Sequence, residues 1–211
     1  MLTNQEYWNE IGPTKEFEDP IYLDKWANFV SYESLIIEYG CGYGRLLGLL
    51  NSAGYSRLLG FDLSPNMLAR GRRENPQLEL KLLKRSGEIP FENESTDAVI
   101  LSTVLCCIVD KKEQTRLIQE ILRILRKGGI LYLTDFLLCD HPKYQEKYER
   151  GVSKFGEWGI YKTNENLIVR HHKAGWIWEL LHSFDIQWFE QFSFKTMNQN
   201  PARTFHCIAK K

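Results

Sequence analysis

The chain has 211 residues, in which 27 lysines and arginines balance 27 aspartates and glutamates, so its formal net charge at pH 7 is zero. That length is enough for one substantial core but short for two ordinary domains, and the balanced charge disfavours a nucleic acid or an anionic membrane as the partner. No apolar stretch reaches the roughly 20 residues of a membrane span, and the polar residues 1–6 are unlike a signal peptide, which predicts a cytoplasmic protein.

Short apolar runs then alternate with amphipathic stretches, a pattern typical of a sheet covered by helices on both faces. Two helical segments, 6–8 and 21–30, are expected ahead of the core, within a helical cap over 1–32. The expected strands are 34–39, 57–62, 78–83, 97–103 and 129–137, and the expected helices are 43–53, 65–74 and 112–126, the last ended by Gly128. Two alternating runs, 184–192 and 204–209, suit a closing antiparallel pair. The sequence thus predicts a single α/β domain over 1–211, with a doubly wound, mostly parallel sheet of seven strands.

The most informative segment joins the first expected strand to the first core helix. It contains Gly40, Gly42 and Gly44, and glycine has no Cβ to obstruct a ligand or to forbid positive φ. A dinucleotide-binding fingerprint would place its last glycine at position 45, where Arg45 stands, so a nicotinamide-dependent oxidoreductase is disfavoured. With Glu38 two residues before the first glycine, the segment instead resembles class I S-adenosylmethionine-dependent methyltransferases.

Later segments extend this resemblance. The second expected strand ends at Asp62, where a carboxylate can accept hydrogen bonds from both hydroxyls of a ribose, and Ser64 and Pro65 are suited to begin the next helix. The segments 86–91 and 97–101 and the helix 113–126 with its following glycines match landmarks of small-molecule methyltransferases related to ubiquinone and arsenite methylating enzymes. The resemblance implies a Rossmann-like fold with an antiparallel C-terminal strand, and S-adenosyl-L-methionine as the cofactor.

The resemblance also implies where this cofactor binds. Its methionine part would lie against the glycine turn, its ribose on Asp62 and its amino-acid end above Ser102 and Thr103. The candidate cofactor-binding residues are Glu38, Gly40, Gly42, Gly44, Asp62, Leu63, Met67, Ser86, Gly87, Glu88, Ser102 and Thr103.

One position departs from the family pattern. Arg85 stands where related chains commonly carry an aspartate that accepts a hydrogen bond from the adenine amino group, and arginine cannot accept. Either Ser86, Glu88 or a backbone carbonyl takes that role, or the adenine is held mainly by apolar contacts. The apolar candidates are Leu63, Met67 and Ile89.

Two segments outside the expected sheet are candidates for covering the cleft. In resembling enzymes a leader such as 1–32 folds over the cofactor, which makes Tyr7 and Trp8 candidate lid residues; the alternative is that they pack on the sheet. Residues 138–176 follow the fifth strand at the carboxyl edge of the sheet, where such enzymes build substrate specificity. This insertion is therefore the expected substrate lid.

The catalytic residue is the least constrained feature, because a sulfonium methyl group is already electrophilic and positioning supplies much of the rate. His171 and His172 are adjacent and would point to opposite sides of an extended chain, so only one can enter the cleft and a paired metal site is disfavoured. Asp135 ends the fifth strand, where it either meets a ligand or caps a turn. The candidate proton acceptors are His171, His172, Tyr161 and Asp135, with Tyr148 and Cys107 as further candidates.

The five cysteines are odd in number and form no C-x-x-C pair, so neither a disulfide framework nor a metal site is expected. The sequence therefore predicts in-line transfer of a methyl group to a small-molecule acceptor, with no membrane partner. An RNA or protein methyltransferase and a cofactor-binding protein without turnover are the alternatives. The acceptor atom, which oxygen, nitrogen, sulfur, arsenic or carbon can each provide on this scaffold, and the oligomeric state stay open.

Overall fold

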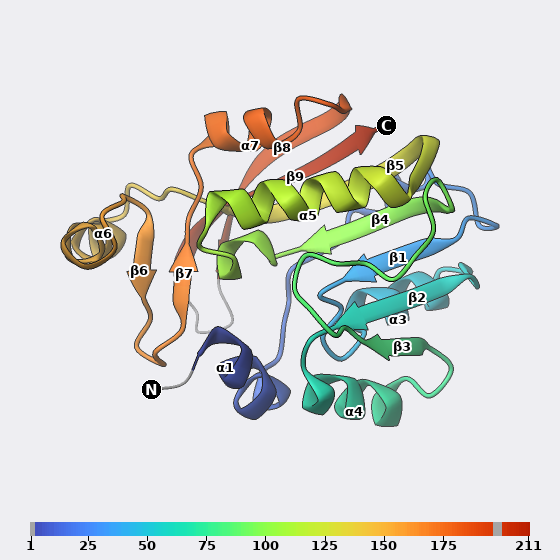
Figure 1. Ribbon diagram of the computed structural model, residues 1–211, viewed down its shortest axis with the longest axis horizontal. Coiled ribbons are helices and arrows are strands. Elements are labelled where there is room, and N and C mark those ends of the chain that lie inside the picture. The colour runs from blue at the N-terminus through green and yellow to red at the C-terminus, as the bar shows by residue number, and fades with distance from the viewer. Residues whose placement is uncertain (1–2, 196–199) are drawn as a thin grey trace.

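The core of the protein is a sheet of seven strands. The computed structural model describes residues 3–195 and 200–211, and its main sheet has the order β3-β2-β1-β4-β5-β9-β8 (Figure 1). β9 is antiparallel to both of its neighbours, β5 and β8, whereas the other neighbouring pairs are parallel. This arrangement confirms the predicted fold class. The strands are β1 (Ile36–Tyr39), β2 (Leu58–Asp62), β3 (Glu79–Leu82), β4 (Thr96–Ser102), β5 (Leu125–Leu137), β8 (Asp185–Lys195) and β9 (Pro201–Lys210).

Helices cover both faces of this sheet, and each face has its own buried cluster. On one face Leu117 packs in a cluster that includes Val99, and on the other Leu47 packs in a cluster that includes Ala98. Because successive residues of a strand point to opposite faces, the neighbours Val99 and Ala98 serve different clusters. Figure 1 shows α5 and α7 in front of the sheet and α3 behind it. The helices are α3 (Arg45–Ser52), α4 (Pro65–Glu74), α5 (Lys111–Ile124) and α7 (Ala174–Leu180).

One helix boundary differs from the sequence-based expectation. α5 ends two residues before the predicted position 126, because Leu125 already has an extended backbone and pairs with Thr96 in the sheet. The next pair along the ladder is Ile130 with Ala98, so β5 bulges between them. Gly128, with a φ of 77°, lies in that bulge rather than at the end of the helix. Sheet pairing therefore ends α5, and the prediction that Gly128 stops the helix was wrong.

The N-terminal segment forms a cap of short elements. It contains α1 (Asn4–Glu10), the 3-10 helix η1 (Gly12–Thr14) and α2 (Leu23–Trp26); residues 1–2 of the predicted cap lie outside the described residues. α1 begins with a capping box, in which Thr3 and Glu6 each accept a hydrogen bond from the other's backbone N–H. In place of the helix expected over 21–30, the structure has only α2, whose last residue, Trp26, is buried in the core. The chain then continues in turns.

A further group of elements lies beyond the carboxyl ends of the parallel strands. Between β5 and α7 the chain forms α6 (Pro142–Phe155) and an antiparallel hairpin of β6 (Ile160–Lys162) and β7 (Ile168–Arg170). Figure 1 shows them on the left, where the arrowheads of β1 and β4 point. We call residues 138–173 the lid. α7 begins at Ala174, so the last residues of the predicted insertion 138–176 belong to a helix that packs on the sheet.

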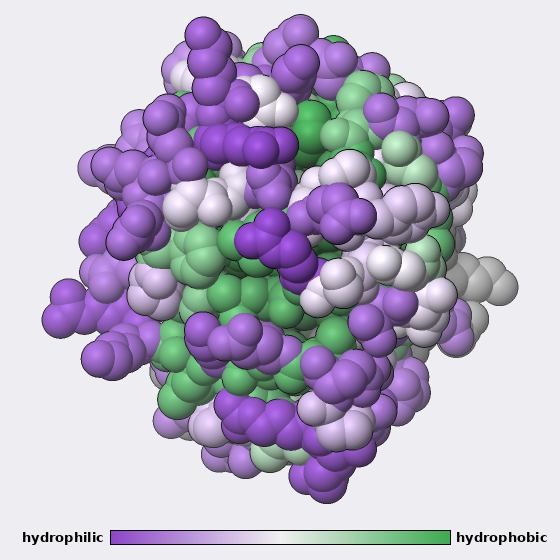
Figure 2. Space-filling view, turned by 90° about the vertical axis from the view of Figure 1, so that its right-hand side faces the viewer, coloured by the Kyte–Doolittle hydropathy of each residue, from purple (hydrophilic) through white to green (hydrophobic). Residues whose placement is uncertain are grey.

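The opposite face of the molecule lies at the amino ends of the parallel strands. Figure 2 shows this face, the right-hand side of Figure 1, with hydrophilic residues around a central hydrophobic area. Over residues 3–195 and 200–211, no helix is both long and apolar enough to cross a membrane.

Candidate active site

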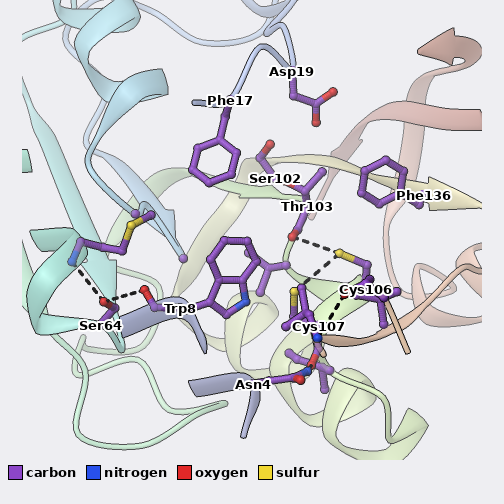
Figure 3. Close-up of a pocket in the computed structure, with 18 of the residues that line it drawn as sticks. Asn4, Trp8, Phe17, Asp19, Ser64, Ser102, Thr103, Cys106, Cys107 and Phe136 are labelled. Atoms are coloured by element: carbon purple, nitrogen blue, oxygen red, sulfur yellow. Dashed lines mark hydrogen bonds between the residues drawn. The ribbon is translucent and has the colours of Figure 1, made fainter. Parts of the chain in front are cut away.

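A cavity of about 750 Å³ opens at the carboxyl edge of the sheet. Its lining comes from the turn after β1, the ends of β2 and β4, the cap and the lid. The volume is within the range of roughly 300–1,000 Å³ that is typical of small-molecule sites, and the carboxyl edge is where open α/β sheets bind ligands. Figure 3 shows the rings of Trp8 and Phe17, both from the cap, reaching into the cavity.

Residues 40–44, the glycine turn, have a backbone that favours glycine. Gly40, Gly42 and Gly44 have φ values of 73°, 54° and 79°, in the left-handed region. A Cβ on Gly40 would lie 2.5 Å from a methyl carbon of Val104, and one on Gly42 would lie 2.8 Å from Cε of Met67. Gly40 and Gly42 line the cavity, whereas Gly44 is the N-cap of α3 and does not.

Asp62 ends β2 at the cavity and braces the glycine turn. Its Oδ2 accepts a hydrogen bond from the backbone N–H of Gly42 (2.8 Å), and its Oδ1 accepts one from that of Ser64 (2.7 Å). Ser64 is the N-cap of α4, as predicted, and its hydroxyl accepts from the N–H of Met67 (3.1 Å). Burial raises the pKa of Asp62, and the N–H donors oppose that rise. The carboxylate thus links the glycine turn to the start of α4 on the cavity wall.

Two other carboxylates at this end of the cavity have unpartnered oxygens. Among the described residues, neither carboxylate oxygen of Asp19 has a hydrogen-bond partner, and Oε2 of Glu38 has none. Burial raises the pKa of Asp19 to about 6 and that of Glu38 to about 8, although the nearby charge of Arg45 opposes both rises. A buried carboxylate without a partner is costly. This end of the cavity is therefore suited to a cation.

The remaining predicted cofactor-binding residues divide into two groups. Those in the lining are Leu63, Met67, Ser86, Ser102 and Thr103; Ser102 is the last residue of β4 and Thr103 follows it (Figure 3). Gly87 and Glu88 are not in the lining: the N–H of Gly87 donates to the hydroxyl of Tyr39 (2.8 Å), and Glu88 lies 3.8 Å from Arg116 of α5. Arg85, the departure from the family pattern, lies 3.6 Å from Glu88 on the surface.

The cap and the lid meet over the cavity. The side-chain amide of Asn4 in α1 donates to the carbonyl of Ile168 in β7 (2.7 Å), and the hydroxyl of Tyr7 donates to Glu165 in the turn of the hairpin. Tyr7 is buried against the lid, whereas Trp8 lines the cavity. Of the two candidate lid residues, Trp8 therefore faces the site and Tyr7 joins α1 to the hairpin.

The lid end of the cavity is built around a neutral histidine. Nδ1 of His171 lies 2.7 Å from the hydroxyl of Tyr148, and Nε2 lies 3.0 Å from the hydroxyl of Tyr161. Burial lowers the pKa of His171 to about 3, and the nearby positive charge of Lys147 adds to this effect. A neutral imidazole has one donor and one acceptor nitrogen, so one tyrosine donates to the ring and the other accepts from it. His171 and Tyr161 line the cavity, but Tyr148 does not.

His172 and Asp135 lie behind the cavity wall. Nε2 of His172 is 3.7 Å from Oδ1 of Asp135, and neither ring nitrogen has a hydrogen-bond partner among the described residues. Asp135 accepts hydrogen bonds from the N–H groups of Cys106 (3.0 Å) and Phe136 (2.7 Å). Burial raises the pKa of Asp135 to about 7 and lowers that of His172 to about 3. Neither residue lines the cavity, so the fold separates the adjacent histidines and brings only His171 to the site.

Two adjacent cysteines line the cavity between β4 and the lid. Sγ of Cys106 lies 3.8 Å from Sγ of Cys107 and donates to the carbonyl of Thr103 (3.2 Å) (Figure 3). The Cys107 thiol and burial raise the pKa of Cys106 well above its usual value, so this thiol stays protonated. Within the described ranges, no group of three or more histidines, cysteines and acidic residues is arranged to hold a metal ion.

Sequence analysis missed several charged residues of the cavity, among them Asp19, Lys147 and Arg45. Asp19 lies in the extended part of the cap, and Lys147 lies in the middle of α6; no local pattern marks either as a ligand contact. Arg45 was visible as the residue that replaces a third fingerprint glycine, and its guanidinium donates to the carbonyl oxygen of Asp19 (2.5 Å). Its position directly after the glycine turn was the sequence feature that could have marked Arg45 as a cavity residue.

Comparison with known proteins identifies the class to which this fold and site belong. Residues 37–133 match the sequence profile of a family described as a methyltransferase domain. The solved structure of a SAM-dependent methyltransferase from Methanosarcina mazei is 25% identical, with a TM-score of 0.84 over 92% of this chain and 99% of that one. The chain carries an S-adenosylmethionine-dependent methyltransferase domain, as its motifs predict. The family and the fold imply S-adenosyl-L-methionine as the cofactor.

Curated relatives are similar over part of their length. Phthiotriol/phenolphthiotriol dimycocerosates methyltransferase of Mycobacterium leprae is 31% identical over 63% of this chain and 44% of its own length. The 18S rRNA (guanine(1575)-N(7))-methyltransferase of Saccharomyces cerevisiae is 32% identical over 55% of this chain and 43% of its own length. The chain spans about half the length of the curated relatives it matches.

Proposed function

We propose that this protein transfers a methyl group from S-adenosyl-L-methionine to a small-molecule acceptor. The observation that carries the proposal is the continuity of the cavity, which joins the glycine turn and Asp62 at one end to His171 and Tyr161 at the other. When bound, the cofactor supplies an electrophilic methyl group. A cavity covered by the cap and the lid suits a small acceptor, and a formal net charge of zero gives no general attraction to RNA.

The acidic end of the cavity fits the positive groups of this cofactor. Asp19 and Glu38 would receive its ammonium group, since each has a carboxylate oxygen without a partner. Asp62 would accept from the ribose hydroxyls while it keeps its bonds from the N–H groups of Gly42 and Ser64. Both tasks are compatible because an ionised carboxylate has about four acceptor positions.

The lid end would hold and orient the acceptor. Tyr161 is the member of the Tyr148–His171–Tyr161 chain whose hydroxyl has no second partner among the described residues, and it lines the cavity. Because burial makes His171 a weak base, its proposed role is to orient the hydroxyl of Tyr161, which would then hydrogen-bond the acceptor. Accurate placement of a nucleophile supplies much of the rate of such a displacement.

Two measurements test the proposal. Calorimetry with S-adenosylhomocysteine and with NAD should show binding of the first only, and tight binding of NAD instead would contradict it. A screen of small acceptors should then yield S-adenosylhomocysteine as product. Methylation of total tRNA or rRNA, with no turnover of any small acceptor, would favour the alternative that the name of the yeast relative suggests.

A further inference from the structure

The end of the cavity at α6, opposite the glycine turn, carries two lysines without an ion-pair partner among the described residues. Lys143 and Lys147 both line the cavity from this helix. Over the described residues, neither lysine lies within ion-pair distance of a carboxylate: Lys143 donates to the side-chain oxygen of Asn200, and Nζ of Lys147 lies over the rings of Tyr144 (5.3 Å) and Tyr161 (5.1 Å). Glu165 of the lid also lines the cavity but forms an ion pair with Lys15, so the end at α6 has a net positive charge, opposite to that of the sheet end.

The two lysines are held close together by the helix. Their i, i+4 spacing places them on the same face of α6, and like charges at that spacing repel. Burial lowers the pKa of Lys147, and the charges of Lys143 and Arg150 add to this effect. Arg150 has its own partner in Glu146 (3.1 Å), so the uncompensated pair is Lys143 and Lys147. An anion in the cavity would remove this repulsion.

The part of the cavity beside the lysines is rich in aromatic side chains. The rings of Tyr144, Tyr161 and Phe136 line it, and His171 beside them is neutral. Aromatic faces of this kind suit a planar or apolar body. A molecule with its anionic group at α6 would extend along these rings toward Thr103 and the glycine turn.

We propose that the acceptor is an organic anion, a carboxylate or a phosphate ester on an apolar or aromatic body, whose negative group is bound by Lys143 and Lys147. Its nucleophilic atom lies at the opposite end, near Thr103. This inference rests on the proposed methyl transfer and adds the chemical class of the acceptor. Charge-assisted hydrogen bonds to the two ammonium groups provide the recognition.

Calorimetry with three probes tests the inference on the full chain saturated with S-adenosylhomocysteine. Benzoate and phenyl phosphate share a phenyl ring and an anionic group, and benzyl alcohol is the neutral match. The anions are expected to bind at millimolar concentration or below, and benzyl alcohol at least about tenfold more weakly. The stronger of the two anions distinguishes a carboxylate from a phosphate ester.

Substitutions on α6 locate the binding. Lys147→Met and Lys143→Met keep most of the side-chain length and remove the charge, and each should weaken binding of the preferred anion about tenfold, with affinity for S-adenosylhomocysteine unchanged within about twofold. Lys154→Met is the matched control, because Lys154 is exposed on the same helix and outside the cavity lining. It should change neither affinity.

The results that would overturn this inference differ from those that would overturn the proposed methyl transfer. Benzyl alcohol binding as tightly as both anions, neither anion binding, or Lys147→Met binding the anion like the parent would each overturn the inference. In those cases intact binding of S-adenosylhomocysteine leaves the proposed methyl transfer standing. Loss of S-adenosylhomocysteine binding in the parent protein would instead overturn the proposed function itself.

Discussion

The two ends of the cavity differ in construction as well as in charge. Most of the sheet end comes from residues close in sequence, from Glu38 to Asp62, to which the cap adds Asp19, and backbone N–H groups hold the carboxylate of Asp62. The lid end is formed by side-chain contacts across the lid, with His171 between Tyr148 and Tyr161. The sheet end, where we propose that the cofactor binds, therefore depends on backbone geometry, which one added side chain can block. The lid end depends on side-chain contacts, so single substitutions there should have smaller effects.

A substitution in the glycine turn should have the largest effect on cofactor binding. Gly42→Val is expected to weaken binding of S-adenosylhomocysteine by roughly a hundredfold or more, because a branched side chain on a backbone with φ of 54° would collide with Met67. Calorimetry measures the affinity, and circular dichroism checks that the fold survives. Gly175→Ala is the control, since a Cβ there meets no atom within 4 Å. Parental affinity in Gly42→Val would show that the glycine turn is not the cofactor site.

Asp62 should give the next largest effect at the sheet end. Asp62→Ala removes an acceptor for the ribose and also the brace on the N–H of Gly42, so cofactor binding should weaken by about 1.5–3 kcal/mol, or roughly tenfold to more than a hundredfold. Asp62→Asn should keep part of the affinity because the amide oxygen still accepts. Dissociation constants for S-adenosylhomocysteine decide the matter, and unchanged values in both variants would place the ribose elsewhere.

The two adjacent histidines test whether the lid end acts on turnover rather than on cofactor binding. His171→Ala should lower kcat/KM at least tenfold, about 1.4 kcal/mol, because Tyr161 loses the ring that orients it, while affinity for S-adenosylhomocysteine stays within about twofold. His172→Ala should mainly lower the Tm, since His172 is buried behind the wall beside Asp135. Steady-state kinetics with an identified acceptor and thermal unfolding of both variants separate these effects. A larger loss of kcat/KM in His172→Ala would contradict this assignment, and full activity in both would make the two histidines structural.

Asp19 gives the smallest expected effect and tests the charge of the sheet end through pH. Its pKa is raised from 3.8 to about 6 by burial, so between these pH values the folded state holds more protons than the unfolded state. The carboxylate therefore costs stability increasingly as pH rises from about 4 to 6, and by a constant amount above. Asp19→Asn should match the parent Tm near pH 4 and exceed it by several °C at pH 8. Its affinity for S-adenosylhomocysteine should fall severalfold.

A control on the same segment completes this pH test. Asp24→Asn changes an exposed aspartate outside the cavity. Its Tm and its affinity for S-adenosylhomocysteine should equal those of the parent at every pH. A lower Tm for Asp19→Asn at pH 8 would contradict the view that its carboxylate is buried without a partner. Unchanged affinity would remove Asp19 from the proposed ammonium site.

The sheet and the glycine turn were largely predictable because their signals are local. The spacing of Gly40, Gly42 and Gly44 after an apolar strand, and of Asp62 at the end of the next, follows from strand and turn geometry within a few residues. The same kind of reasoning was wrong for Gly128, since sheet pairing by Leu125 ended the helix before the glycine was reached. Local propensity yields where a long-range partner competes for the backbone.

The α/β fold and the glycine turn follow from the sequence alone, because periodicity and glycine spacing act over one turn or one strand, and the resemblance to class I methyltransferases implied the cofactor. Only the tertiary structure decided that Asp19 reaches the cavity, that Tyr7 meets Glu165 across 158 positions, and that His171 enters the site while His172 stays behind its wall. Contacts of this range depend on how the cap and the lid pack over the sheet edge. That packing is set by burial of side chains distant in sequence, which no local pattern records.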